Sequence, residues 1–178
     1  MSERQKSILD AAVRVIARTG VRGLRVEQLA AEAGISTALI YYHFGDRAGL
    51  LRRTLEHIND RAADYTQSTG VELDLLLLQE LQDTEAVRVN STAWGELRAT
   101  AVFNEELREP LADSTRVWVA EIADAIRRAH PDAPATDVAE RLTALVEGLS
   151  ERWLSGSITL DRARDLLRGA IALELPDR

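Results

Sequence analysis

Apolar residues recur at intervals of three and four along most of this chain, which is the spacing of an amphipathic α-helix. Alternating apolar and polar runs are absent, as are the Asn-Gly and Asp-Gly pairs that favour β-hairpins. The pattern therefore predicts an all-α protein. Helices are expected at about 3–19, 26–33, 37–43, 47–64, 72–82, 85–103, 105–130, 137–154 and 160–173.

Capping residues precede several of these segments. Ser, Thr and Asp side chains accept hydrogen bonds from the first amides of a helix, and Glu or Gln three residues later completes a capping box. The expected N-caps are Ser2 with Gln5, Ser36, Asp137 with Glu140, and Thr159.

The segment 24–55 has the organisation of a helix-turn-helix. Two short helices meet at a tight turn that contains Gly34, and a longer helix follows. Leu29 and Ile35 are expected to pack the two short helices together, and Ser36 caps the second one. The amides at that capped end suit phosphate, and such a helix fits the major groove of DNA. The segment therefore predicts an N-terminal three-helix domain that binds double-stranded DNA.

The run 41–44 concentrates aromatic side chains at the end of the second short helix. It holds three of the eight aromatic residues of the chain. Tyr42 and Phe44 are two residues apart and are expected to turn toward the first helix, whereas Tyr41 and His43 face the other way. A phosphate-contacting surface explains the cluster better than a structural corner, which stays the alternative.

Charge is distributed unevenly along the chain. The whole protein has a formal charge of −7, but residues 1–55 carry nine basic and five acidic residues, a net of +4. The remaining 123 residues carry a net of −11. A basic N-terminal region followed by an acidic remainder indicates that only the N-terminal region binds an anion.

Motifs for catalysis and for cofactors are missing. The chain has no Cys, so thiol catalysis, thiolate zinc sites and disulfides are excluded. The single lysine, Lys6, lies outside any glycine loop, and no Gly-x-Gly occurs. His57 and Asp60 share a helix face, but two ligands make a poor metal site, and a solvated face is the preferred interpretation. We therefore expect no enzyme activity, cofactor or metal.

Two other classes of protein stay open at this point. One is an all-helical enzyme, which the missing motifs disfavour. The other is an interaction module whose helix-turn-helix binds a protein instead of DNA.

Residues 5–55 resemble the N-terminal DNA-binding domain of the TetR (tetracycline-repressor) family. The resemblance implies a DNA-binding domain at 1–46, a ligand-binding and dimerisation domain with a helical bundle at 47–178, and no catalytic role. It is carried by Ile8-Leu9-Asp10-Ala11-Ala12, Gly20, Leu29-Ala30-x-x-Ala33-Gly34-Ile35-Ser36, Ile40-Tyr41-Tyr42-His43-Phe44, Arg47 and Leu50-Leu51.

The resemblance also assigns roles to individual positions. Side chains matching Ser36, Tyr41 and His43 commonly touch the DNA backbone, and those matching 37–39 face base edges. Arg47 stands where the family usually has a phosphate-binding Lys. Arg25 stands where the family usually has a Thr cap and is expected to reach a phosphate instead, and Gln28 is expected to assist the residues that face the bases. The expected DNA-binding residues are Arg25, Gln28, Ser36, Thr37, Ala38, Leu39, Tyr41, His43 and Arg47.

The three residues at 37–39 offer one hydroxyl and two apolar groups. Such side chains suit thymine methyl groups and do not make bidentate contacts with guanine. We therefore expect phosphate contacts and DNA shape to supply most of the affinity.

The region 56–178 resembles, more loosely, the choline-responsive subgroup of the family. The resemblance implies that the last two helices pair with their twins in a homodimer, which matches a palindromic operator. Their apolar stripes equally fit an intramolecular core, and periodicity leaves that choice open. The expected interface residues are Leu142, Leu145, Leu149, Trp153, Leu166 and Ala170.

Trp94 and Arg98 are four residues apart and share a helix face. An apolar pocket with one Arg suits an amphipathic, anionic ligand. An ordinary core is the alternative. The expected residues around an unknown small-molecule effector are Trp94, Arg98, Phe103, Asn104 and Trp118.

The ends and the hydropathy of the chain complete the prediction. The N-terminal MSERQKS lacks the apolar stretch of a signal peptide, and no apolar run approaches the ~20 residues of a membrane span. We therefore expect a cytoplasmic homodimeric transcriptional regulator, a repressor that a small molecule releases from a palindromic DNA operator, with no membrane contact.

Overall fold

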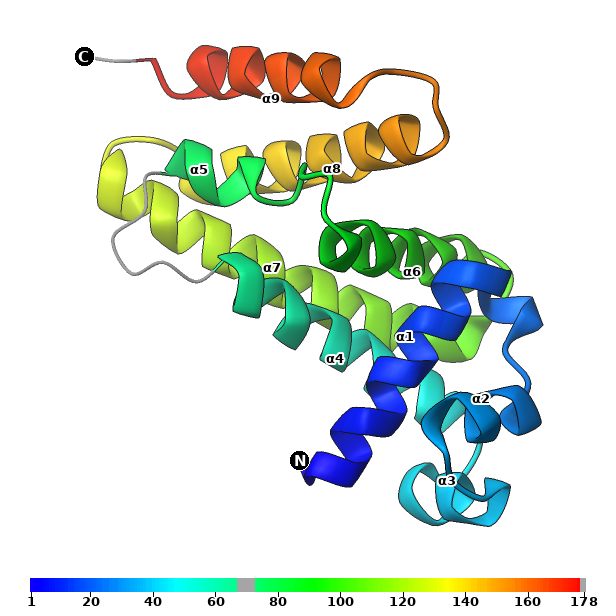
Figure 1. The fold of residues 1–178 in the computed structure, drawn as a ribbon. Helices are drawn as coiled ribbons and strands as arrows, with labels where there is room; N and C mark the ends of the chain where they lie inside the picture. The colour runs from blue at the N-terminus through cyan, green and yellow to red at the C-terminus, as the bar shows by residue number, and fades with distance from the viewer. Residues whose placement is uncertain (67–72, 177–178) are drawn as a thin grey trace. The chain divides into compact units, whose positions relative to one another are not determined.

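The structure is a computed structural model that describes residues 1–66 and 73–176, with side chains at 1–62 and 76–176. The regular elements within these ranges are helices, which confirms the all-α prediction (Figure 1). They are α1 (Glu3–Gly23), α2 (Val26–Ala33), α3 (Thr37–Phe44), α4 (Arg47–Thr66), α5 (Leu73–Leu78), α6 (Glu85–Ala101), the 3₁₀ turn η1 (Glu105–Leu107), α7 (Arg108–Ala129), α8 (Ala135–Leu154) and α9 (Leu160–Glu174).

The chain divides into two compact units. Unit 1 comprises Met1–Arg61 and Thr92–Ser114, and unit 2 comprises Ala62–Ser91 and Thr115–Arg178. Helices α4, α6 and α7 contribute residues to both units. The predicted boundary between residues 46 and 47 separates two functions and stays a prediction. The compact units divide elsewhere, because α4 begins at Arg47 and belongs to unit 1 as far as Arg61.

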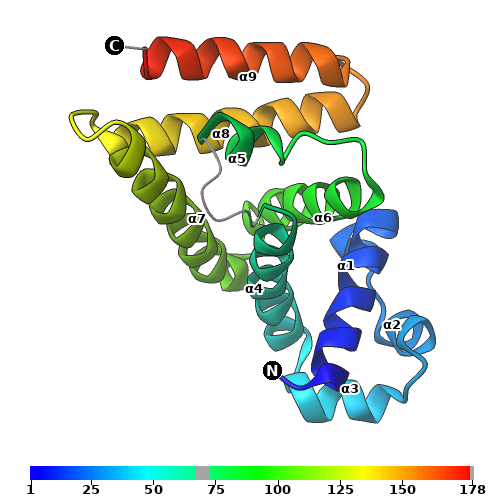
Figure 2. The ribbon, with the colours of Figure 1, turned by 60° about the vertical axis from the view of Figure 1, so that its left-hand side comes forward.

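Unit 1 is organised around α1. Helix α2 packs against both α1 and α3 and so joins the other two helices of the helix-turn-helix domain (Figure 2). Apolar side chains from four helices fill this core, and most of them are completely buried. They include Ile8, Leu9 and Ile16 from α1, Leu29 from α2, Ile40 from α3, and Leu50, Leu51 and Leu55 from α4.

A buried polar link joins α1 to α4. The Nε2 atom of His57 lies 2.8 Å from the Oδ1 atom of Asp10, and Arg61 donates to the same oxygen at 2.8 Å. His57 is 2% exposed, so the prediction that it lies on a solvated face is wrong. The reason is that α1 packs over this part of α4. The described residues contain no cluster of three or more His, Asp or Glu side chains that could hold a metal.

Three of the four predicted N-caps are confirmed. Ser2 and Gln5 form the expected capping box, the Ser36 hydroxyl accepts from the Leu39 amide, and the Thr159 hydroxyl accepts from the Arg162 amide. The capping box at Asp137 and Glu140 is wrong, because α8 begins two residues earlier, after Pro134. Asp137 lies within the first turn instead, where its charge favours the helix dipole.

Helix α1 extends beyond the predicted end at Gly20. Gly20 leaves helical geometry (φ 72°, ψ 168°), and helical structure then resumes up to Gly23. A positive φ of this size suits glycine, which has no Cβ to collide with the backbone. The predicted stop is therefore a break in the helix.

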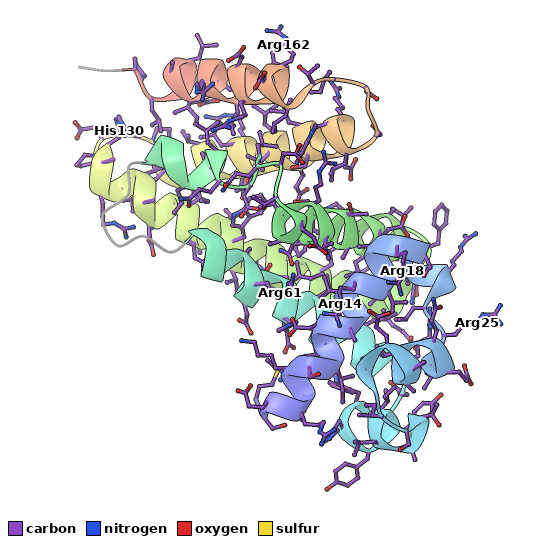
Figure 3. All side chains as sticks on the ribbon, viewed as in Figure 1. Arg14, Arg18, Arg25, Arg61, His130 and Arg162 are labelled. Carbon is purple, nitrogen blue, oxygen red and sulfur yellow. The ribbon has the colours of Figure 1, made fainter. Side chains whose placement is uncertain are left out.

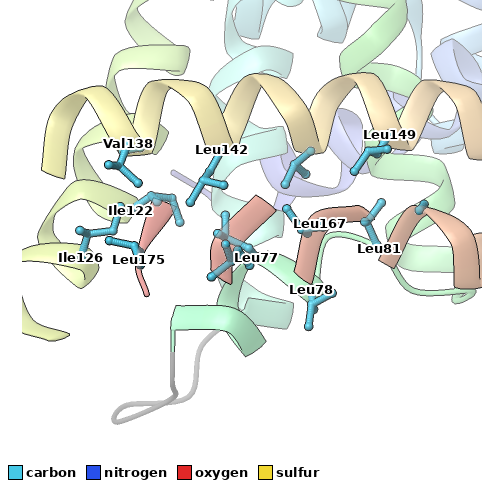
Figure 4. Packing of buried hydrophobic residues seen from close by; sticks show 14 of the residues in the cluster. Leu77, Leu78, Leu81, Ile122, Ile126, Val138, Leu142, Leu149, Leu167 and Leu175 are labelled. Carbon is cyan, nitrogen blue, oxygen red and sulfur yellow. The ribbon is translucent and has the colours of Figure 1, made fainter. Parts of the chain in front are cut away.

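Unit 2 has its own apolar core, formed by α5, α7, α8 and α9 (Figure 4). Helices α8 and α9 pack along each other, and α5 packs on α9. Leu142, Leu149 and Trp153 belong to this core and are 1%, 2% and 7% exposed. This corrects the expectation that these three side chains face a second copy of the chain.

None of the described helices combines the length and the apolar composition needed to cross a bilayer.

Candidate DNA-binding surface

The turn between α2 and α3 has the backbone that the sequence predicted. Gly34 adopts the left-handed conformation (φ 66°, ψ 37°), and the Ile35 amide donates to the Ala30 carbonyl at 2.9 Å. These features end α2 in the way that glycine C-caps commonly do. Ser36 is extended and caps α3 with its hydroxyl. The two short helices therefore form a helix-turn-helix, with the capped end of α3 directly after the turn.

Helix α3 buries one narrow face and exposes the opposite one. Ile40 and Phe44, four residues apart, are 1% and 9% exposed. Tyr41 and Tyr42 are 49% and 81% exposed, and Ala38 is exposed as well. Because Ala38 and Tyr42 are four residues apart, they share the outward face.

Tyr42 corrects the expectation that it turns toward α1 together with Phe44. Side chains two residues apart share a face in a strand, whereas in a helix they are about 200° apart. The 3.6-residue period that identified α3 was the signal that could have placed Tyr42 outside. Tyr42 is therefore an exposed aromatic side chain that the sequence prediction of DNA contacts missed.

The remaining predicted contacts lie on or beside the same two helices. Arg25 precedes α2, makes no side-chain capping bond and is exposed, which leaves its guanidinium extended away from the helix (Figure 3). Four of the others are half-buried and therefore present only part of their side chains to solvent. These four are Gln28, Thr37, Leu39 and His43.

Arg47 has a structural role that the sequence prediction missed. One guanidinium nitrogen donates to the carbonyl oxygen of Leu24, and the other terminal nitrogen donates to the carbonyl oxygen of Val21 at 2.5 Å. The Val21 carbonyl also accepts from the amide of the C-cap residue Leu24 at 3.2 Å, so Arg47 adds a second donor at the end of α1. Both terminal nitrogens of Arg47 therefore already bind carbonyl oxygens at the end of α1. The expected contact between Arg47 and a DNA phosphate stays a prediction.

Surface ion pairs occupy several basic residues of the N-terminal region. Arg14 and Arg18 on α1 bind the Glu32 carboxylate at 3.2 Å and 2.8 Å (Figure 3). Hydrogen bonds from Arg18 and Arg14 lower the pKa of Glu32 below its usual value. Arg53 is also paired, with Glu56, so three of the nine basic residues counted in this region have carboxylate partners within the protein. The number of basic residues therefore overstates the number of cations available to DNA.

The predicted effector residues are only partly brought together. The Arg98 guanidinium carbon lies 5.3 Å from the Trp94 ring centroid, a cation–π distance. Phe103 is 83% exposed, which corrects the expectation that it lines a pocket. The Asn104 side chain accepts from the Glu106 amide at 3.1 Å and so caps η1. Trp118 belongs to unit 2, where it packs against the apolar core.

The outer surfaces of α8 and α9 retain part of the predicted interface. Leu145, Leu166 and Ala170 are partly buried at the edge of the unit 2 core. Leu173 is 86% exposed, and a Cβ added at Gly148 or Gly169 would meet no atom within 4 Å. Leu173 is a further apolar side chain on the same face of α9 as Leu166 and Ala170, because it lies seven and three residues beyond them.

Two family models match the chain. A model described as bacterial regulatory proteins of the tetR family matches residues 8–54, and one described as the C-terminal part of BetI-type transcriptional repressors matches residues 71–176.

Proteins with names and solved structures resemble the chain over most of its length. HTH-type transcriptional regulator BetI of Escherichia coli is 26% identical, covering 98% of this chain and 95% of the relative, and BetI of Burkholderia thailandensis is 27% identical over 87% and 82%. A TetR-family regulator from a Rhodococcus species has a TM-score of 0.92 at 47% identity, covering 98% and 100%. A transcriptional regulator from Saccharomonospora viridis, crystallised with choline, has a TM-score of 0.80 at 27% identity and covers 100% of both chains.

Proposed function

Because the chain belongs to the TetR family of bacterial regulatory proteins and has a C-terminal part of the BetI type, we propose that it is a homodimeric repressor that releases a palindromic operator when a small molecule binds. The protein is a transcriptional regulator, and its relatives carry the names of regulators and not of enzymes. The observation that carries the proposal is the exposed face of α3, which begins at the Ser36 cap and ends in two exposed tyrosines.

We propose that α3 enters the major groove with Ala38 and Tyr42 toward the bases. Both side chains lie on the outward face, and neither can form the bidentate contacts that Arg makes with guanine or Asn makes with adenine. A methyl group and a phenol ring instead suit the methyl group of thymine. Contacts to the DNA backbone are assigned to the flanking residues Arg25, Ser36, Tyr41 and His43, with Gln28, Thr37 and Leu39 at the edges of the reading face.

We propose a dimer interface that uses the outer faces of α8 and α9. It keeps Leu145, Leu166 and Ala170 from the sequence prediction and adds Leu173 and the open surface at Gly148 and Gly169. Small residues allow two helices to approach closely, and an isologous interface aligns two copies of α3 with a two-fold DNA site. Successive major grooves on one side of the DNA are about 34 Å apart, so the dimer fixes the spacing of the half-sites.

We propose a quaternary ammonium compound as the effector, with choline as the first to test. The support is the similarity to the Saccharomonospora viridis regulator that binds choline and to the BetI relatives. Aromatic rings attract such cations, and the Trp94 ring already holds the guanidinium of Arg98. A choline headgroup at this ring would therefore compete with Arg98 for the same face.

The proposal can be tested by selecting binding sites from a randomised double-stranded DNA library with the purified protein. The affinity for the enriched site is then measured by fluorescence anisotropy across a salt series. We expect a palindromic site. We also expect a slope of log affinity against log salt steeper than about −4, which corresponds to more than about four neutralised phosphates at about −0.9 each. Choline chloride should weaken binding more than sodium chloride at the same concentration, which controls for ionic strength.

Each part of the proposal fails in its own way. Absence of any enriched site would favour a helix-turn-helix that binds protein, and such contacts rarely show a steep salt slope. An enriched site without two-fold symmetry would contradict the dimeric operator. A palindromic site that choline and sodium chloride affect equally would contradict the proposed effector alone.

A further inference from the structure

The last turn of α1 is a short restart after a break. The helix leaves helical geometry at Gly20 and resumes over Val21–Gly23, only two residues before α2 begins. The first amides of a restarted helix lack intrahelical acceptors, and the last carbonyls lack intrahelical donors. Side chains from other elements bind this turn at both of its ends, in addition to the bond from the Leu24 amide to the Val21 carbonyl.

Glu96 of α6 binds the amide end of this turn. Its Oε2 atom accepts a hydrogen bond from the Val21 amide at 3.2 Å, and both residues belong to unit 1. The approach is close, because a Cβ added at Gly20 would lie 2.7 Å from the same oxygen. Glycine at position 20 thus meets two requirements, a positive φ and room for the carboxylate.

Arg47 of α4 binds the carbonyl end. Its guanidinium donates to the carbonyl oxygens of Val21 and Leu24. Helices α4 and α6 therefore hold the same turn from opposite ends with groups of opposite charge. Hydrogen bonds from charged groups are roughly twice as strong as those between neutral groups. The turn leads directly into α2 and α3, so its placement fixes where the helix-turn-helix begins.

The opposite side of α6 carries the predicted effector residues. Trp94 and Arg98 are four residues apart and share one face, whereas Glu96 lies two residues from each and projects about 200° away from either one. If an effector bound at Trp94 and Arg98 and moved α6, the Glu96 carboxylate that binds the Val21 amide would therefore move as well.

We propose that Glu96 is a positioning residue that sets the placement of α3 in the dimer by holding the break at Gly20 and Val21 against α6. The inference rests on the proposed dimeric operator. Glu96 contacts no DNA in this scheme, and it acts through the Val21 amide. A carboxylate that only stabilised the fold would affect every form of DNA binding in proportion to the loss of stability.

The test compares the full palindromic operator with a DNA fragment that contains one half-site. Glu96→Ala should weaken binding to the full operator at least tenfold and change half-site binding less than twofold, because each α3 keeps its own contacts. Glu96→Gln keeps an acceptor oxygen without the charge and should lie between Glu96→Ala and wild type. Glu106→Gln removes another exposed carboxylate of unit 1 and is the matched control, with no expected change.

Gly20→Ala gives an independent variant of the same contact. The added Cβ collides with the Glu96 carboxylate, so the full operator should again be weakened more than the half-site. In the Glu96→Ala background the part of the effect that comes from the collision should disappear, whereas the strain of a side chain at positive φ should remain. A non-additive double-mutant cycle would show that the two residues act as one unit.

The outcomes separate the two proposals. A wild-type protein that binds the full operator no more tightly than the half-site would contradict the dimeric operator itself. If the wild type shows the preference and Glu96→Ala keeps it, or loses affinity equally on both fragments, the positioning role is wrong.

A direct measurement uses the absence of cysteine in the chain. A single Ala31→Cys on the exposed side of α2 accepts one spin label in each copy of the dimer. The distance distribution between the two labels should shift or broaden in Glu96→Ala and stay unchanged in Glu106→Gln. An unchanged distribution in Glu96→Ala would overturn the inference.

Discussion

Helix α3 and the pair α8 and α9 both carry apolar and aromatic side chains, but they use them differently. On α3, Tyr41 and Tyr42 are 49% and 81% exposed, and only Ile40 and Phe44 face the core. On α8, Leu142, Leu149 and Trp153 are almost completely buried by neighbouring helices of unit 2. Apolar character alone therefore does not identify a contact surface. The exposed fraction within a single chain distinguishes side chains that are available to DNA or to a second copy from those already packed in the core.

The largest effect is expected from a substitution in the α8 core. Leu142→Ala should lower the free energy of unfolding by about 3 kcal/mol, because it removes buried methyl groups and leaves a cavity. Chemical denaturation followed by circular dichroism measures the change. Ala144→Ser, on the exposed side of the same helix, is the control and should change stability little. A dimer that dissociates while each chain keeps its full stability would instead place Leu142 in the interface.

The next effect concerns the exposed face of α9. Leu173→Glu should weaken dimerisation at least a hundredfold, because each interface would bury two charges without partners. The far-ultraviolet spectrum of the chain should stay helical, since Leu173 is 86% exposed within one chain. Analytical ultracentrifugation across a concentration series measures the dissociation constant. Unchanged dimerisation would refute the interface on α9 and leave the α3 surface unaffected.

Tyr42→Ala tests the corresponding statement about α3. The affinity for the selected operator should fall about tenfold to a hundredfold, since burying a large apolar side chain is worth about 1.5–3 kcal/mol. The melting temperature should change little, whereas Phe44→Ala should lower it strongly because Phe44 is buried.

Uracil in place of a contacted thymine removes only a methyl group. This replacement should cost the wild type about fourfold in affinity, since a buried CH₂ contributes about 0.8 kcal/mol. It should cost Tyr42→Ala less. Equal losses in both proteins would place Tyr42 away from the thymine methyl group.

The smallest effect is expected from Asp10, which links α1 to α4 and lies outside the DNA-binding face of α3. Burial raises the pKa of Asp10, but hydrogen bonds from His57 and Arg61 outweigh it and leave the pKa below the usual value of 3.8. Asp10 therefore stabilises the fold above about pH 4, and this contribution is lost as the pH falls through the lowered pKa. Asp10→Asn should cost about 1 kcal/mol at neutral pH.

Urea unfolding at a series of pH values measures this contribution. The difference in stability between wild type and Asp10→Asn should shrink below pH 4. Half-site DNA affinity should stay the same in Asp10→Asn, in contrast to Tyr42→Ala. A difference in stability that does not depend on pH would show that the charge of Asp10 is unimportant.

The sequence alone located α3 better than it located individual side-chain contacts. The Ser36 cap and the Gly34 turn are local features, and both appear in the structure as predicted. Tyr42 was assigned to the wrong face because a two-residue spacing was used within a helix. Arg47 and Glu96 were missed as partners of α1, because they bind backbone groups more than 20 residues away in the chain.

The amino-acid sequence by itself determined the helices and the helix-turn-helix, because periodicity, caps and turn glycines act over a few neighbouring residues, and its resemblance to known regulators indicated the family. Tertiary structure decided which apolar side chains of α8 form the core, why Gly20 accepts no side chain, and where the charges of Glu96 and Arg47 are used. Those outcomes depend on which helices lie side by side. The apolar stripe of one helix does not specify which element packs on it. Burial and long-range hydrogen bonds are therefore determined only when the helices have packed.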